Sequence, residues 1–561
     1  MTLSRLQLQL KPLEVPRDDD INANGYVTFD TRPLPPSRRT YGPWQFVGLW
    51  IVTGSYNISG WTTGSSLISL GLNVWQSMLI VIISNVILGV MCVVAGAPGA
   101  KWHVGFPIMN RSFWGMWGSA VPLAFRIFLS FIWTSTNTWW GGQCVRTLIG
   151  AISPSFVNLN KPLAGGTMQL NQFVAYILFI LMCLPLVWLS PERYKIPFTI
   201  ATISVIPCVF ALLIWFMVQA GGGGSLLADV SGVSGVKQAT GGHLGWMFVL
   251  GLTSNIGGAI THMFSQTDYT RYARQKNDQV LAQLIMVPLG AIVNGAIGII
   301  CTSCANKIFP ETTKLLWQPF DVLAALQAHY DNSPKSRAAV AVASIAFIFA
   351  CFGITVASNM VVAGIDLAAT FPRYFNIRRG AYTTLLIAIV CQPWQLYNGA
   401  TNFLSVVGGY SVFLAPFLSI NFADYYVVRK RNLKLTDLYD FSDRSIYWFT
   451  YGVNWRAAVA WLMGVWLVMP GYVQHIRTPK VELRGWSQIY YLTVWVGFIV
   501  PAAVYLALDR VWPIENRCDV DDRDYFGTFE EKVQVVDGRV EEGIDISSEV
   551  VRVDVKGHER L

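Results

Sequence analysis

Apolar residues run in long stretches from about residue 44 to residue 510, and no polar domain separates these stretches. Each stretch reaches or approaches the roughly 20 residues that a helix needs to cross the hydrocarbon core of a bilayer. We therefore predict an all-α polytopic membrane protein. Its twelve predicted spans lie at about residues 44–70, 74–97, 117–149, 172–190, 197–219, 244–266, 279–305, 337–370, 381–397, 402–427, 455–474 and 487–509.

The composition supports this prediction, since 53% of the 561 residues are apolar and 13% are charged, whereas soluble domains carry about 25% charged residues. The net charge of +8 does not indicate a nucleic-acid partner, because the cations lie mainly in short loops. Loops after even-numbered spans are richer in Lys and Arg; the loop after span ten holds Arg429, Lys430, Arg431 and Lys434. By the positive-inside rule this predicts cytoplasmic termini, and we expect a plasma-membrane protein surrounded by lipid bilayer.

The pattern divides the chain into a membrane domain and two polar tails. The N-terminal tail spans 1–43, and the acidic C-terminal tail spans 511–561. The membrane domain spans 44–510 and consists of two blocks of five spans, at 44–219 and 244–427, and two extra helices at 455–509. The acidic tail has few large apolar residues, so we predict that it is disordered. Trafficking or ubiquitin-ligase adaptors would dock on such tails.

Two spans are interrupted at matching positions in the two blocks of five. Span one contains the run Gly54–Gly60, and span six contains Thr253–Gly258, both rich in Gly, Ser and Asn. Gly and Asn disfavour a continuous helix, and unwound backbone at membrane depth is tolerated where it lines a cavity. Matched interruptions indicate the binding site of a transporter. The alternative is a pair of Gly-rich faces for helix packing.

Polar residues at helical spacing mark spans three and eight. Trp133 and Asn137 share one face of span three, and Thr355 and Asn359 share one face of span eight, each at i and i+4. Trp offers a flat surface for stacking, and the two amides offer donor and acceptor edges. No carboxylate or Arg is expected on these faces, which favours a neutral planar heterocycle with an imide or ureide edge. Helix-to-helix contacts for either Asn, and free amino acids as substrate, remain open.

Several sequence motifs match one family. They are the residues from Arg39 to Trp44, Trp139 to Val145, Asp268 to Tyr272, Ala363 to Leu367 with Phe371 to Arg373, Tyr410 to Leu414 with Ala423 to Tyr426, and Gly452 to Arg456. On these motifs the chain resembles the first nucleobase–cation symporter family, and within it the fungal uracil, allantoin and uridine permease branch. The resemblance extends from about Arg39 to Tyr525.

The resemblance implies a five-plus-five inverted repeat of the leucine-transporter type with two additional helices. The substrate would lie between the broken helices 1 and 6 and helices 3 and 8. Trp133 matches the family's stacking Trp, and Asn359 matches the Asn that reads the base. Asn137 stands where the family usually has Gln, which shortens the amide by one methylene.

The resemblance also assigns the residues at the two helix breaks. Gly258 and Ala259 fall at the helix-6 break, where a sodium-coupled bacterial relative has a second stacking Trp at the position of Ala259. Its absence implies a one-sided aromatic clamp or another aromatic partner such as Tyr56. Tyr56 and Asn57 are the substrate-binding candidates on helix 1.

The resemblance also indicates the coupling ion, through the residue types at two positions of helix 8. In sodium-coupled relatives two helix-8 hydroxyl groups bind the ion, and the matching positions here are Gly353 and Ile354. We therefore expect proton symport, with no cofactor and no bound metal. Gating or proton coupling is assigned to Asp268, His262 and Leu404. For Asp268 and Asp366 the alternative is simple pairing with Arg271 or Arg373, and for His262 it is a neutral core residue.

The sequence thus predicts a secondary active transporter that takes up uracil, allantoin, uridine or a related purine or pyrimidine together with a proton. The alternative within the family is a vitamin permease for thiamine or nicotinamide riboside. In the nucleobase branch we expect the Asn seven residues before Asp366, as Asn359 is, and one residue earlier in the vitamin branch. An enzyme, a channel and a receptor are disfavoured, because the chain shows no metal cluster, charged pore ring or folded soluble module.

Overall fold

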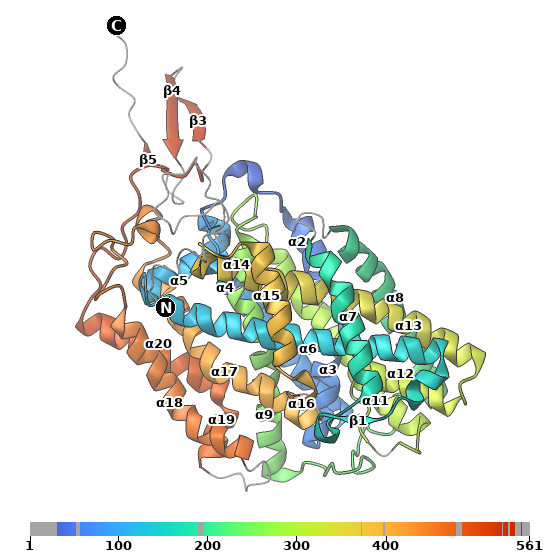
Figure 1. Cartoon of the computed structure of the whole chain (residues 1–561). Coiled ribbons are helices and arrows are strands. Elements are labelled where there is room, and N and C mark those ends of the chain that lie inside the picture. The colour runs from blue at the N-terminus through green and yellow to red at the C-terminus, as the bar shows by residue number, and fades with distance from the viewer. Residues whose placement is uncertain are drawn as a thin grey trace, which may run out of the picture.

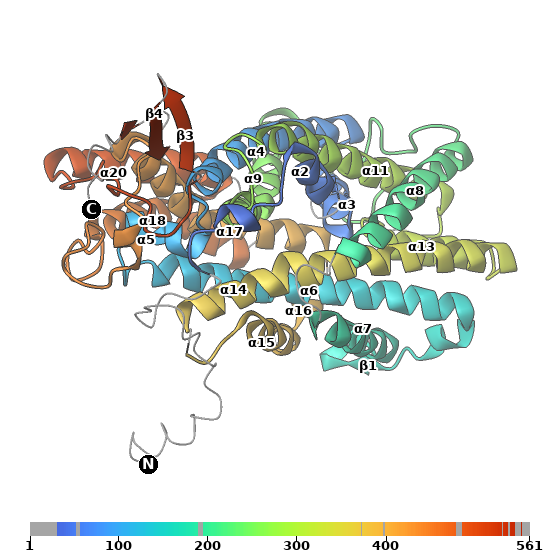
Figure 2. The same cartoon turned by 90° about the horizontal axis from the view of Figure 1, so that it is seen from above.

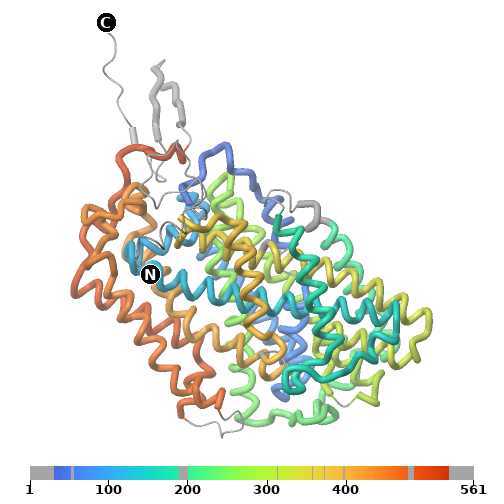
Figure 3. Tube along the Cα trace, viewed as in Figure 1, coloured from blue at the N-terminus to red at the C-terminus, as the bar shows by residue number. Residues whose placement is uncertain are grey.

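The computed structural model describes residues 31–51, 56–188, 195–312, 314–371, 373–396, 399–477 and 485–529 and three short strands near the C-terminus. Figure 3 traces the bundle in colours that run from blue at its N-terminal end to red at its C-terminal end. Long helices pack side by side in a single bundle (Figures 1 and 2). Within the described residues, nine helices are long and apolar enough to cross a membrane. The chain is therefore a polytopic helical membrane protein.

Seven α-helices form the described part of the first block of spans. They are α2 (Pro43–Trp50), α3 (Ile58–Ser65), α4 (Val74–Trp102), α5 (Phe106–Trp114), α6 (Ala120–Ile152), α7 (Leu170–Trp188) and α8 (Lys195–Ala220). The 3₁₀ turns η2 (Pro36–Arg38), η4 (Ser66–Leu70), η5 (Pro154–Asn158) and η6 (Ala164–Gly166) and the strands β1 (Pro162–Leu163) and β2 (Met168–Gln169) lie between or before them.

The second block and the C-terminal region are also helical in their described residues. They are α9 (Gly241–Phe264), α10 (Gln266–Thr270), α11 (Val287–Ile308), α12 (Pro319–His329), α13 (Pro334–Gly353), α14 (Val361–Thr370), α15 (Ile377–Val390), α16 (Pro393–Leu396), α17 (Ala400–Phe422), α18 (Trp455–Arg477), α19 (Trp486–Tyr491) and α20 (Thr493–Val511). Three π-helical turns, η8 (Ala282–Met286), η9 (Ile354–Met360) and η10 (Ala423–Val428), continue into or out of these helices, and η11 (Thr436–Tyr439) is a 3₁₀ turn. Near the C-terminus β3 (Glu531–Val536) pairs antiparallel with β4 (Arg539–Ile544), and β4 pairs with β5 (Val551–Arg552).

The count of twelve spans stays a prediction. Span three is α6, a 33-residue helix. It is not among the nine described helices that are apolar enough to cross a membrane. Most of its residues are buried inside the bundle, where polar side chains can find partners. Span nine is α15, whose 14 residues extend about 21 Å at 1.5 Å per residue, less than the hydrocarbon core. Span one is divided between α2 and α3.

The interruption predicted in span one is confirmed for Tyr56 and Asn57, which precede α3 and are not helical. Helix α2 ends at Trp50 and α3 begins at Ile58, while residues 52–55 lie outside the described residues. Asn57 has an extended backbone, and its side-chain oxygen accepts a hydrogen bond from the Gly60 N–H at 2.9 Å. Asn57 is therefore the N-cap of α3, the role for which Asn is among the favoured residues.

The interruption predicted in span six is wrong, because α9 is one continuous helix from Gly241 to Phe264. Its polar and small residues pack against neighbouring helices. Thr253 donates to the Tyr491 carbonyl at 2.6 Å, and Ser254 donates to the Leu404 carbonyl at 3.1 Å. A Cβ added to Gly257 would lie 2.5 Å from the Val407 carbonyl oxygen, so Gly257 permits close contact between α9 and α17. The packing-face alternative is the correct interpretation of this run.

Both tails pack against the same end of the bundle, so the prediction of a disordered C-terminal tail is wrong as far as Phe529. The Asp521 carboxylate accepts hydrogen bonds from the Leu435 and Thr436 N–H groups at 2.7 and 3.2 Å. The Phe529 ring makes an edge contact with Trp102 at a centroid distance of 6.0 Å. From the other tail, the Leu34 N–H donates to the His103 carbonyl at 3.1 Å.

Candidate functional site

A partly open cavity lies inside the described bundle. Its wall is built from spans one, three, six, eight and ten. The lining residues are Ser59 of α3; Arg126, Leu129, Ser130, Trp133 and Asn137 of α6; Thr261, His262 and Phe264 of α9 with Ser265 after it; Ile354, Ser358 and Asn359 of η9; Val362 of α14; and Leu414 of α17. Trp133, Asn137, Asn359 and His262 were predicted.

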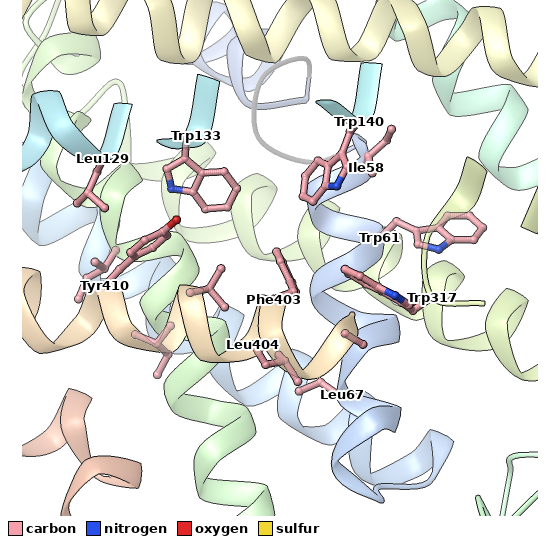
Figure 4. Packing of buried hydrophobic residues seen from close by; sticks show 14 of the residues in the cluster. Ile58, Trp61, Leu67, Leu129, Trp133, Trp140, Trp317, Phe403, Leu404 and Tyr410 are labelled. Carbon is pink, nitrogen blue, oxygen red and sulfur yellow. The ribbon is translucent and has the colours of Figure 1, made fainter. Parts of the chain in front are cut away.

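One face of α6 provides the longest wall of the cavity. Arg126, Ser130, Trp133 and Asn137 line it at i, i+4, i+7 and i+11, the spacing of a single helical stripe. The Trp133 ring lies opposite Tyr410 of α17, with centroids 5.9 Å apart and planes tilted by 58° (Figure 4). The indole N–H of Trp133 is buried and has no hydrogen-bond partner among the described residues. Trp133 therefore offers both a flat surface and an unused donor.

The two amides of the site are held by their own helices. The side-chain nitrogen of Asn137 donates to the Trp133 carbonyl at 2.9 Å, and that of Asn359 donates to the Ile354 carbonyl at 3.1 Å. Asn359 thus bonds a carbonyl five residues earlier within the π-helical turn η9, a feature that frequently occurs at functional sites. Each amide uses one donor in this way, which leaves a second N–H and a carbonyl oxygen for a ligand.

A buried triad of charges includes Arg126, one of the residues that line the cavity. Arg126 donates to Asp268 at 2.6 Å and, through Nε, to Asp366 at 2.6 Å, and its second terminal nitrogen also bonds Asp366. Their exposed fractions are 5%, 7% and 0%, respectively. The guanidinium lies 4.3 Å from the centre of the Phe106 ring, and the Phe106 N–H donates to Asp268 at 2.9 Å.

Two sequence-based expectations are wrong at this triad. An Arg does lie on the site face of span three, and Asp268 and Asp366 both pair with Arg126, not with Arg271 or Arg373. The position of Arg126 was available from the sequence, because it stands seven residues before Trp133 on the same stripe. Its partners were not, since they lie 142 and 240 residues away.

The structure separates the remaining predicted residues from the cavity wall. Gly258 faces the Val407 side chain of α17, and Ala259 is partly buried beside it without lining the cavity. Thr355 is completely buried in η9, and its hydroxyl has no partner among the described residues. Leu404 is buried, and its carbonyl accepts from α9. These positions support the wall and do not form it.

The helix-1 candidates also have other neighbours than expected. The Tyr56 ring lies 6.3 Å from Phe210 of α8, so it is not the aromatic partner of Trp133 in this structure. Tyr410 has that place instead. Asn57 caps α3, and Ser59, two residues later, is the α3 residue that lines the cavity.

A second aromatic layer lies beyond Trp133 along α6. The Trp140 ring faces Phe403 at 6.1 Å, and Phe403 also contacts Trp317 at 5.4 Å (Figure 4). Trp133 and Trp140 are seven residues apart on α6, as are Phe403 and Tyr410 on α17, so the two antiparallel helices meet in matched aromatic pairs. Trp140 and Phe403 are fully buried. Sequence patterns did not reveal this pairing because it depends on the register between two distant helices.

A helical membrane bundle with an internal cavity lined by an aromatic ring and two amides is typical of a transporter for a small molecule. The family model described as "Permease for cytosine/purines, uracil, thiamine, allantoin" matches residues 33–497, and the chain belongs to this family of transporters.

Similar proteins agree with this assignment. An uncharacterized permease of Schizosaccharomyces pombe is 31% identical over 487 residues, covering 86% of this chain and 80% of that protein. The allantoin permease of Saccharomyces cerevisiae is 29% identical over 491 residues, covering 86% and 76%. The structure of Mhp1, a nucleobase–cation-symport-1 family transporter in a closed conformation with bromovinylhydantoin bound, matches with a TM-score of 0.64 at 17% identity over 88% of this chain and 98% of Mhp1. This match confirms the predicted fold.

Proposed function

We propose that the protein takes up a neutral planar heterocycle with an imide or ureide edge, together with a proton, by alternating access across the plasma membrane. Uracil, allantoin, uridine and related purines or pyrimidines are substrates of this class. The observation that carries the proposal is the cavity wall shared by Trp133, Asn137 and Asn359. A planar ring would stack on Trp133 while the free donor and acceptor groups of the two amides bond its edge.

The charge of the Arg126 triad supports proton coupling. One guanidinium and two carboxylates carry a net charge of −1 when all three are ionised, and all three are buried. A buried charge that lacks a partner of opposite sign is costly, because it has lost its contact with water. A single proton neutralises the triad and removes this cost, whereas Gly353 and Ile354 offer no side-chain oxygen to a sodium ion.

Uptake is expected to rise when the external solution is acidified relative to the interior and to be unaffected by a sodium gradient. The physical reason is that protonation of the triad accompanies closure around the substrate. The measurement is radiolabelled uptake into vesicles under an imposed pH gradient or an imposed sodium gradient. Sodium-dependent uptake without a proton current would refute proton coupling.

A second candidate, a vitamin permease, is favoured by the same excess negative charge. Thiamine and nicotinamide riboside are cations, and either could neutralise the triad in place of a proton. The family description includes thiamine beside the nucleobases.

Direct uptake of each compound distinguishes the nucleobase transporter from the vitamin permease. In a transport-deficient yeast that expresses the chain, we expect saturable uptake of at least one of uracil, uridine, allantoin and uric acid, and no saturable uptake of thiamine or nicotinamide riboside. The vector alone is the control. Saturable uptake of the vitamins alone would overturn the main proposal and support the second.

A further inference from the structure

Helix α3 begins at a contact with α11 that no motif indicated. The side-chain nitrogen of Asn294 donates to the backbone carbonyl of Asn57 at 2.8 Å. Asn294 is completely buried and Asn57 is 7% exposed. The same carbonyl accepts a longer bond of 3.3 Å from the Trp61 N–H. The Asn294 amide therefore provides the shorter of these two bonds, at the point where span one resumes its helix.

Helices α3 and α11 lie side by side (Figure 2), and glycines allow contact between their backbones beyond this bond. A Cβ added to Gly64 would lie 2.4 Å from the Gly295 carbonyl oxygen. A Cβ added to Gly298 would lie 2.4 Å from the Trp61 carbonyl oxygen. Small residues allow helices in membranes to approach this closely, so α3 is fixed to α11 along its length as well as at its start.

The start of α3 determines where Ser59 lies. Asn57 is the N-cap, its side chain bonds the Gly60 N–H, and Ser59 between them lines the cavity. A shift in the first turn of α3 would therefore move the Ser59 hydroxyl along the cavity wall.

We propose that Asn294 is a positioning residue of the substrate site: its amide fixes the first turn of α3 and thereby places Ser59 at the cavity wall. The inference rests on the proposed function only for its effect on transport. The placement of Ser59 itself can be measured without a substrate.

The first experiment measures this placement directly. Ser59→Cys is introduced into the full chain, and the rate at which a small thiol reagent alkylates this cysteine is measured in membranes. The rate is compared between the chain with Asn294 and the chains with Asn294→Ala or Asn294→Leu. The chain without Ser59→Cys gives the background from the native cysteines. Loss of the donor leaves the Asn57 carbonyl with its longer bond, and we expect the rate to change by roughly threefold or more. An unchanged rate in both variants would overturn the proposal.

The matched control is Thr302→Val on the same helix. Thr302 is also buried, and its hydroxyl donates to the backbone carbonyl of Leu316 outside α11 at 2.9 Å. It does not line the cavity. This variant removes an equivalent bond, so we expect an unchanged alkylation rate. A change equal to that of the Asn294 variants would mean that any loss of packing on α11 has the same effect, and would overturn the proposal.

The second experiment uses the best substrate found in the yeast assay. We expect Asn294→Ala to raise KM by roughly fivefold or more, with the maximal rate per molecule at the cell surface nearly unchanged. In a double-mutant cycle with Ser59→Ala, the two effects on KM should be non-additive, because one residue acts through the other. Additive effects would contradict the proposal. If no compound is transported but the alkylation rates differ as expected, the proposed function fails while the role of Asn294 stands.

Discussion

Asp366→Asn is expected to abolish accumulation of substrate against its gradient, so that the internal concentration only reaches that of the medium. Asparagine preserves the shape of the carboxylate. The remaining Arg126–Asp268 pair is neutral, so no excess negative charge is left for a proton to neutralise. Because the pair stays compensated, the fold should persist. The measurement is the internal-to-external ratio of labelled substrate as external pH is varied, which should become independent of pH.

The control for this variant is another buried aspartate in an ion pair. Asp424 accepts from Arg429 at 2.8 Å and from the Tyr505 hydroxyl at 2.7 Å, and it does not line the cavity. Breaking a buried pair by removing one partner costs about 3–5 kcal/mol, so Asp424→Asn should lower thermal stability. Its surviving molecules should still couple uptake to pH. Retained pH-driven accumulation in Asp366→Asn would exclude Asp366 as part of the coupling mechanism.

Trp133→Ala is expected to raise KM by about 5- to 150-fold, because stacking of a base on an aromatic side chain contributes about 1–3 kcal/mol. Asn359→Ala should have an effect of similar size, since a buried polar group of the ligand would lose its partner. The combination should remove saturable uptake. The measurement is concentration-dependent uptake normalised to the protein at the cell surface.

Trp139→Ala provides the matched control for Trp133. Trp139 is the same residue type on the same helix and is buried, but its ring contacts Tyr176 and Trp394 outside the cavity. We expect this variant to lose stability while its KM stays close to that of the wild type. Normal uptake by both Trp133→Ala and Asn359→Ala would refute the site.

The positions of Trp133, Asn137 and Asn359 on the cavity wall could be predicted, because each depends on spacing within a single helix. Trp133 and Asn137 share a helical face by spacing alone, and Asn359 follows from a short polar run in an apolar span. Ser59 could not be separated from Asn57 and Tyr56 in this way, because a break in a helix leaves no periodicity from which to read orientation.

The run from Thr253 to Gly258 shows why local composition can mislead. Small and polar residues serve either an unwound segment or a close helix contact, and the sequence does not distinguish the two. The hydroxyls of Thr253 and Ser254 bond carbonyls of α19 and α17, elements about 150 to 240 residues away. These tertiary partners keep α9 continuous, because they satisfy the polar groups without unwinding the helix.

The sequence by itself determined the class of protein, the approximate positions of most spans and the chemistry of Trp133, Asn137 and Asn359. These depend on apolar length and helical spacing, which are local properties of the chain. The tertiary structure decided that Arg126 holds Asp268 and Asp366, that Tyr410 faces Trp133 and that Asn294 fixes the start of α3. Each of these contacts joins residues far apart in the chain, and their positions depend on how whole helices pack against one another.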